Sequence, residues 1–103
     1  MAITSIGKYR IYLVGAITDN PNWEKEFAEA ERKALDEGYI VLSPTTYPKG
    51  LTQKEYMVLS VANVFLADVI RTVNDWKDSK GTHVEIALAK AIGTQIQYRG
   101  DKS

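Results

Sequence analysis

The chain has 103 residues, of which 45% are hydrophobic and 25% are charged, a composition that predicts one soluble globular domain over residues 1–103. Thirteen basic residues balance thirteen acidic ones, so no basic surface indicates binding to nucleic acid. The absence of cysteine excludes disulfides and thiolate metal sites, and the single histidine, His83, argues against a zinc site. No apolar run approaches the roughly 20 residues of a membrane span and the N-terminus lacks the apolar core of a signal peptide, so we expect a cytoplasmic protein without membrane contact.

Strand and helix patterns alternate from the start of the chain. The β-branched and aromatic run at residues 10–14 predicts a strand. Apolar residues at helical spacing then predict a helix, with Asn20 as its cap, Pro21 in its first position and Gly38 as its terminator. A second strand is expected at residues 39–43.

The second half of the chain repeats this alternation. Thr52 and Glu55 have the spacing of a capping box, which predicts a helix that runs to about residue 65. Residues 67–73 form an apolar run that suits a buried parallel strand, and residues 94–98 predict a fourth strand after Gly93. Between these strands a third helix is expected, and its apolar markers are Val84, Leu88 and Ala91.

The order βαβαβαβ predicts a parallel sheet with helices on both faces. We therefore expect a small three-layer α/β sandwich with four or five strands, of the Rossmann or flavodoxin-like type. In such sheets ligands bind at the carboxyl ends of the strands. The expected binding site is thus built from residues 74–85 and from the loops at residues 15–22 and 43–51.

Glu85 is the sharpest candidate for chemistry. If Ser79 or Gly81 lies near the helix cap, Glu85 falls in the first helical turn, where the helix dipole stabilises an ionised carboxylate. A glutamate held ionised in a pocket can serve as a nucleophile or as an electrostatic partner in glycosyl chemistry. First-turn glutamates also complement the dipole of many helices without any catalytic role, so the spacing alone leaves both interpretations open.

The residues just before Glu85 are candidates for substrate binding. Ser79, Gly81 and Thr82 offer hydroxyl groups and close backbone approach to a sugar, and they suit a helix cap equally well. Asp75 and Trp76 offer a polar and aromatic wall for a base, and they also suit a solvated loop.

Two short motifs resemble a known family, the nucleoside 2-deoxyribosyltransferase superfamily, and in particular its short branch of bacterial and phage domains. Tyr12, Gly15 and Ile17 resemble its opening Tyr-x-x-Gly-x-Ile, although a strand tyrosine by itself is more often a core residue. The run "SKGTHVE", from Ser79 to Glu85, resembles the signature Asp/Ser-x-Gly-x-x-x-Glu. The resemblance implies that Glu85 is the nucleophile and that Tyr12 lies beside the substrate. A serine at the first signature position is similar to the 2'-deoxynucleoside 5'-monophosphate N-glycosidase branch.

The resemblance implies an N-glycosidase or deoxyribosyltransferase that acts on a deoxynucleoside or deoxynucleotide, needs no cofactor and forms a homodimer or a higher homo-oligomer. The apolar run at residues 55–68 predicts that the second helix mediates this dimer. Two features depart from the family, because Ser60 stands where an active-site carboxylate is expected and residues 15–20 carry no basic group for a phosphate. These departures keep open two alternatives: a non-catalytic protein that binds a nucleotide or nucleotide-derived signal in the same pocket, and an interaction module with a vestigial pocket.

Overall fold

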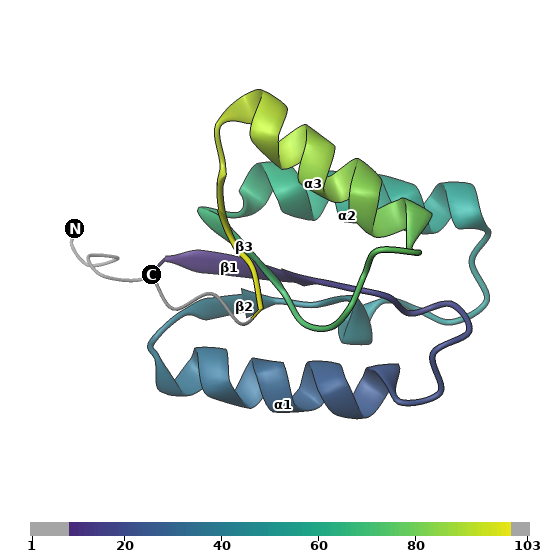
Figure 1. Cartoon of the computed structure of the whole chain (residues 1–103), viewed down its shortest axis with the longest axis horizontal. Coiled ribbons are helices and arrows are strands. Elements are labelled where there is room, and N and C mark those ends of the chain that lie inside the picture. Colours follow the sequence, from purple (N-terminus) through teal and green to yellow (C-terminus); the bar gives the residue numbers. More distant parts are fainter. Residues whose placement is uncertain (1–8, 100–103) are drawn as a thin grey trace.

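The computed structural model describes residues 9–99, which form a four-stranded parallel sheet covered by three α-helices. In chain order the elements are β1 (Arg10–Val14), α1 (Trp23–Asp36), β2 (Ile40–Leu42), the 3-10 helix η1 (Pro44–Thr46), α2 (Gln53–Leu66), β3 (Val69–Thr72), α3 (Lys80–Ile92) and β4 (Gln95–Gln97). The strand order is β2-β1-β3-β4, and each neighbouring pair is parallel. Figure 1 shows α1 below the sheet and α2 and α3 above it. The predicted three-layer α/β sandwich is therefore confirmed.

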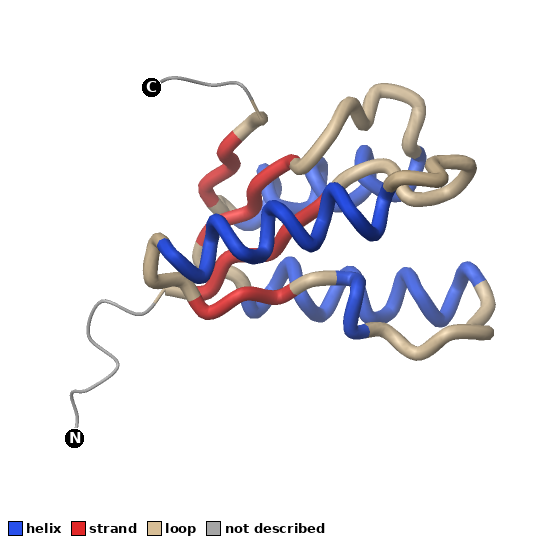
Figure 2. The backbone as a smooth tube through the Cα atoms, turned by 90° about the horizontal axis from the view of Figure 1, so that it is seen from below, coloured by secondary structure: helices blue, strands red, loops and turns tan. Residues whose placement is uncertain are grey.

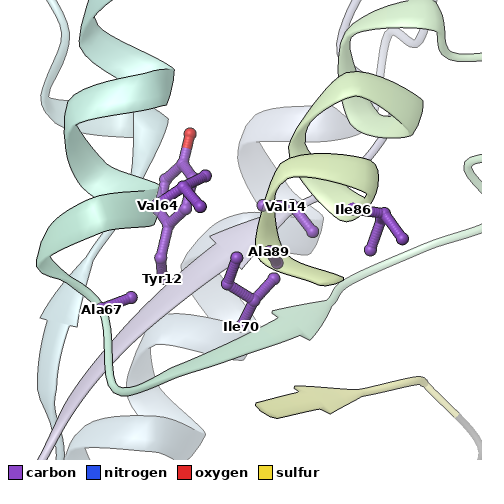
Figure 3. Packing of buried hydrophobic residues seen from close by; sticks show 7 residues of the cluster. All are labelled: Tyr12, Val14, Val64, Ala67, Ile70, Ile86 and Ala89. Atoms are coloured by element: carbon purple, nitrogen blue, oxygen red, sulfur yellow. The ribbon is translucent and has the colours of Figure 1, made fainter. Parts of the chain in front are cut away.

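Strand β1 lies inside the sheet and sends its side chains alternately to the two faces. Ile11 and Leu13 belong to the core that packs against α1, whereas Tyr12 and Val14 belong to the core under α2 and α3. Figure 3 shows the Tyr12 ring rising from β1 beside Val64 of α2, with its hydroxyl oxygen pointing away from the sheet. The alternation thus places the phenol ring of Tyr12 on the face of the sheet that α2 and α3 cover.

The loops that follow β1, β2 and β3 gather at one end of the molecule, on the right in Figure 1 and Figure 2. Each of these loops leads from the carboxyl end of a parallel strand towards the start of a helix. This is the end at which open α/β sheets bind ligands.

The start of the first helix differs from the prediction. Helix α1 begins at Trp23 with Asn22 in the cap position, so Asn20 does not cap it. Instead the Asn20 side-chain amide donates to the Ala16 carbonyl and to the Glu26 carboxylate, both at 2.9 Å. Asn20 therefore closes the loop after β1, while its side-chain oxygen accepts from the Asn22 amide at 3.1 Å. The strands β2, β3 and β4 are also shorter at both ends than predicted.

Helix α3 presents a face to the core that differs in part from the predicted one: Leu88 packs against the core, but Val84 and Ala91 are exposed. Val84 is 47% exposed, whereas the buried residues are Thr82, Glu85, Ile86 and Ala89. The helix begins at Lys80, so Glu85 lies in its second turn and not in the first. The prediction that the helix dipole keeps Glu85 ionised was therefore wrong: packing of α3 against α2 and the sheet turns this carboxyl group inward.

Helix α2 begins at the predicted capping box. The Thr52 hydroxyl accepts from the Glu55 amide at 3.2 Å, and the Glu55 carboxylate accepts from the Thr52 amide at 2.8 Å. Val64 is the one fully buried residue of this helix, while Val58 and Phe65 are 68% and 61% exposed. Much of the apolar surface of α2 is therefore left uncovered by the described residues.

Within residues 9–99, no helix has the length and apolar character needed to cross a membrane.

Candidate active site

A cavity of about 610 Å³ opens at the carboxyl end of the sheet. Its wall comes from β1, from the segments that follow β1, β2 and β3, and from the N-terminal parts of α1, α2 and α3. The volume is that of a typical small-molecule site. The cavity thus lies where the sequence predicted a binding site.

The Glu85 carboxyl group lies on the cavity wall, although the residue is only 7% exposed. The Tyr12 hydroxyl donates a hydrogen bond to Glu85 Oε2 at 2.6 Å. Burial raises the pKa of Glu85 to about 7 because desolvation disfavours the charged form, and the hydroxyls of Tyr12 and Ser60 partly offset this effect. Glu85 is therefore partly protonated and partly ionised near neutral pH, a state that suits an acid–base group and leaves a share of carboxylate for nucleophilic attack.

Tyr12 serves this site as a donor. Its burial, and next the negative charge of Glu85, raise the pKa of Tyr12 far above the ordinary value of 10.0. The phenol therefore stays protonated and keeps its hydrogen available for Glu85.

Two residues that sequence reasoning missed extend this contact. The Tyr47 hydroxyl lies 3.1 Å from the Tyr12 hydroxyl, and the Asn63 side-chain amide donates to Tyr47 Oη at 2.6 Å. Tyr47 follows η1 and Asn63 lies in α2, so no local motif connects them. The one available signal is that Ser60 and Asn63 interrupt an apolar run at i and i+3, which places them on the same side of the helix.

The structure brings together most of the residues that the sequence singled out. The predicted site residues that line the cavity are Tyr12, Gly15, Ile17, Asp75, Ser79, Gly81, Thr82 and Glu85.

Trp76 is the exception and requires a correction. Its ring stacks on Tyr98, with the centroids 6.2 Å apart, and meets the edge of His83 at 4.9 Å. Trp76 packs against the core under α2 and α3 and does not line the cavity, because a large apolar ring is more stable covering the core than facing water.

The residues at the start of α3 combine cavity wall and helix cap. Ser79 Oγ accepts from the Thr82 amide at 3.3 Å and lies 2.9 Å from the Thr82 hydroxyl. Ser79 therefore caps α3, which is the structural role that its position in the sequence also allowed. At Gly81 an added Cβ would meet nothing within 4 Å, so packing in the described structure does not demand a glycine there.

Gly15 has a packing role beside the cavity. A Cβ at Gly15 would lie 2.6 Å from Asn74 Oδ1, which is shorter than a real contact allows. Asn74, another residue that the sequence analysis did not single out as functional, donates to the Ala16 carbonyl and to Glu26 and accepts from the Ala16 amide at 2.8 Å. Asn74 thus joins the loop after β3 to the loop after β1, and Gly15 leaves the space for it.

Carboxylates outnumber amines on the cavity wall. The acidic residues are Asp19, Glu24, Asp75, Asp78 and Glu85, and the basic residues are Lys49 and Lys80. Ser60 also lines the cavity, in the position where the family resemblance implies a carboxylate. Among residues 9–99 no group of three His, Cys, Asp or Glu side chains is placed to hold a metal ion. Most of the wall therefore disfavours an anionic ligand group.

Comparison with solved structures places the fold among known proteins. The chain is similar to a 2-deoxyribosyltransferase from Bacillus psychrosaccharolyticus, with a TM-score of 0.68, 18% identity, and coverage of 86% of this chain and 70% of that chain. It is also similar to a conserved protein from Enterococcus faecalis V583, with a TM-score of 0.63 and 16% identity, over 88% of this chain and 62% of that one, less than two thirds of its length. These likenesses confirm the resemblance at the level of the fold.

Comparisons of the sequence complete this placement. A comparison with curated proteins finds no match. A family model described as a domain of unknown function, DUF4406, matches residues 9–98. The chain therefore belongs to the DUF4406 family.

Proposed function

We propose that the protein acts on the N-glycosidic bond of a deoxynucleoside, either as an N-glycosidase or as a 2-deoxyribosyltransferase. The observation that carries the proposal is the buried Glu85 carboxyl group on the cavity wall, with Tyr12 donating to it at 2.6 Å. The fold that this chain shares with a 2-deoxyribosyltransferase supports the same chemistry.

In the proposed reaction the ionised Glu85 attacks the anomeric carbon of the sugar. A carbon–oxygen bond to Glu85 forms as the carbon–nitrogen bond breaks, the electron pair leaves with the base, and the base takes up a proton from solvent. The transition state has oxocarbenium character, which the negative carboxylate stabilises. Attack by water then yields the free sugar, attack by a nitrogen of a second base yields a new nucleoside, and either step regenerates the carboxylate.

We expect an uncharged deoxynucleoside to be preferred over its 5'-monophosphate. A phosphate monoester adds a charge of about −1.5 to −2 near neutral pH. Asp19 after β1 and Glu24 at the start of α1 line the cavity, and Lys49 and Lys80 are the only basic groups among the described residues of its wall. Electrostatic repulsion from the carboxylates therefore favours the substrate without a phosphate.

Base release from a panel of deoxynucleosides and their monophosphates tests the proposal. Free base is measured by chromatography with and without a second base, which distinguishes transfer from hydrolysis. Glu85→Gln is the matched control, since it keeps the side-chain shape and an acceptor for Tyr12 while removing the charge. If the wild-type protein releases no base from any substrate between about pH 5 and about pH 8, the window that brackets the Glu85 titration, the enzymatic proposal is refuted.

A non-catalytic nucleotide-binding protein is the second candidate, and Ser60 is the observation that favours it. Ser60 lines the cavity without offering a carboxylate, so the wall lacks one charge that the family resemblance implies. In this case the cavity holds a nucleotide or a nucleotide-derived signal without cleaving it. Saturable binding in calorimetry, without release of base, would distinguish this function from catalysis.

We further propose that α2 mediates a homodimer. Val58 and Phe65 are separated by seven residues and lie on one side of the helix, where they are 68% and 61% exposed. Leu66 is half exposed beside them. A second copy of the chain would remove this apolar surface from water.

A further inference from the structure

Three hydrogen bonds connect Asn63 of α2 to Glu85 of α3 through two tyrosines. The Asn63 amide nitrogen lies 2.6 Å from Tyr47 Oη, Tyr47 Oη lies 3.1 Å from Tyr12 Oη, and Tyr12 Oη lies 2.6 Å from Glu85 Oε2. The chain of contacts passes from α2 through the segment after η1 and through β1 to α3. It reaches Glu85 at the hydroxyl that points away from the sheet in Figure 3.

The donors in this hydrogen-bond chain determine the direction in which each hydrogen bond is donated. A phenol carries one hydrogen, and an amide nitrogen can only donate. When Glu85 is ionised, Asn63, Tyr47 and Tyr12 supply one hydrogen to each of the three contacts. When Glu85 is protonated, Tyr12 can still donate to it, but the acceptor is then a neutral carboxyl group, which forms a weaker hydrogen bond than a carboxylate does. A donor at position 63 therefore favours the ionised form of Glu85.

We propose that Asn63 is a positioning residue that acts through Tyr47 and Tyr12 to keep Glu85 ionised and its Oε2 fixed in the cavity. The proposal rests on the proposed function only for its catalytic consequence, since the hydrogen-bond chain exists without a substrate. Burial raises the pKa of Glu85 to about 7, so the chain opposes the effect of burial and sets the share of carboxylate near neutral pH.

Other titratable groups face the same cavity. They come from the segments after β1, β2 and β3 and from the three helices, and they are Asp19, Glu24, Lys49, Tyr56, Asp75, Asp78 and Lys80. All of them stay the same in the variants considered below. A difference in the pKa of Glu85 between variants therefore reports on residue 63 and on the hydrogen-bond chain.

Asn63→Asp is the sharpest test because it keeps the shape of the side chain and replaces a donor by an acceptor. Tyr47 then donates to residue 63, Tyr12 is drawn to donate to Tyr47, and the ionised Glu85 loses its donor. We expect the pKa of Glu85 to rise by at least about one unit, which lowers its ratio of carboxylate to acid at least about tenfold at a given pH. The measurement is a titration of ¹³C-labelled glutamate carboxyl groups by NMR, with the Glu85 signal identified by its loss in Glu85→Gln.

The added negative charge would also act on Glu85 directly through space, and a double variant separates the two effects. In the double variant, Tyr47→Phe interrupts the hydrogen-bond chain while the charge added by Asn63→Asp remains. The shift in the pKa of Glu85 caused by Asn63→Asp should therefore fall to less than about half of its size in the background with Tyr47. A shift of equal size in both backgrounds would overturn the proposal. If Asn63→Asp does not fold, Asn63→Leu removes the donor without adding charge. A smaller rise in the same direction supports the proposal, and an unchanged pKa of Glu85 overturns it.

The pH profile of base release connects this chain to the proposed function. The midpoint of the profile should shift by the same amount as the NMR titration in Asn63→Asp. If the NMR shift is found but the wild-type protein releases no base, the proposed catalysis fails and the inference about Asn63 stands. If base is released and the pKa of Glu85 does not change with residue 63, the inference fails and the catalysis stands.

Discussion

Replacing Glu85 by Gln should change how the stability of this protein depends on pH. Glu85 titrates near its ordinary value of 4.5 in the unfolded chain and near 7 in the folded protein. Below both values each state holds the proton, so the two states respond equally to pH. Between the two values the folded state holds the proton and the unfolded state has released it. Raising the pH through this window therefore favours unfolding, and the loss is complete above the folded pKa.

The structure supplies the size of this effect. The pKa of Glu85 rises from 4.5 to about 7, a change of about 2.5 units, and each unit corresponds to about 1.36 kcal/mol. The wild-type protein should therefore lose ~3 kcal/mol of folding free energy between about pH 4.5 and about pH 7 through this one group. Small domains have a total of roughly 5–15 kcal/mol, so the effect is large enough to measure.

Urea denaturation of the wild-type protein and of Glu85→Gln across this pH range tests the prediction. The difference between the two free energies of unfolding removes the contribution of other groups, such as Glu26 and Asp68, whose pKa values are lowered by their own hydrogen bonds. We expect Glu85→Gln to gain stability relative to the wild type as the pH rises. A difference that stays constant with pH, or that changes in the opposite direction, would show that Glu85 is not held in a desolvated site.

Three further predictions address catalysis, assembly and packing. Glu85→Gln should lower base release on the order of 100- to 1000-fold and change ligand affinity far less, as measured by chromatography and calorimetry on the same samples. Phe65→Glu should convert a dimer to a monomer in light scattering, whereas Leu35→Glu on α1, at the same 61% exposure, should not; a monomeric wild type at micromolar concentration would contradict the dimer. Gly15→Ala should lower the free energy of unfolding by about 1–3 kcal/mol, because its Cβ would lie 2.6 Å from a side-chain oxygen, whereas Gly81→Ala should be neutral or slightly stabilising. Equal stability of the two alanine variants in urea would contradict this reasoning.

The sequence by itself determined the features of this protein that depend on near neighbours in the chain. The β-branched and aromatic run at residues 10–14 forms a strand with these same bounds. Thr52 and Glu55 form the predicted capping box, and Gly93 ends α3 in the left-handed conformation with φ 82°. Each of these signals acts over five residues or fewer, and the strict alternation of strands and helices then leaves a parallel layered fold as the arrangement that buries both faces of the sheet.

The tertiary structure alone decided the chemistry of the site. Which face of α3 turns inward depends on how that helix packs against α2 and the sheet, and this places Glu85 in a desolvated second turn. Trp76 stacks on Tyr98, 22 residues later in the chain, and therefore does not line the cavity. Tyr47 and Asn63 are 16 residues apart and meet only in the folded protein. A carboxyl group takes its pKa from burial and from its hydrogen-bond donors, and both come from segments distant in the sequence, so no local pattern specifies them.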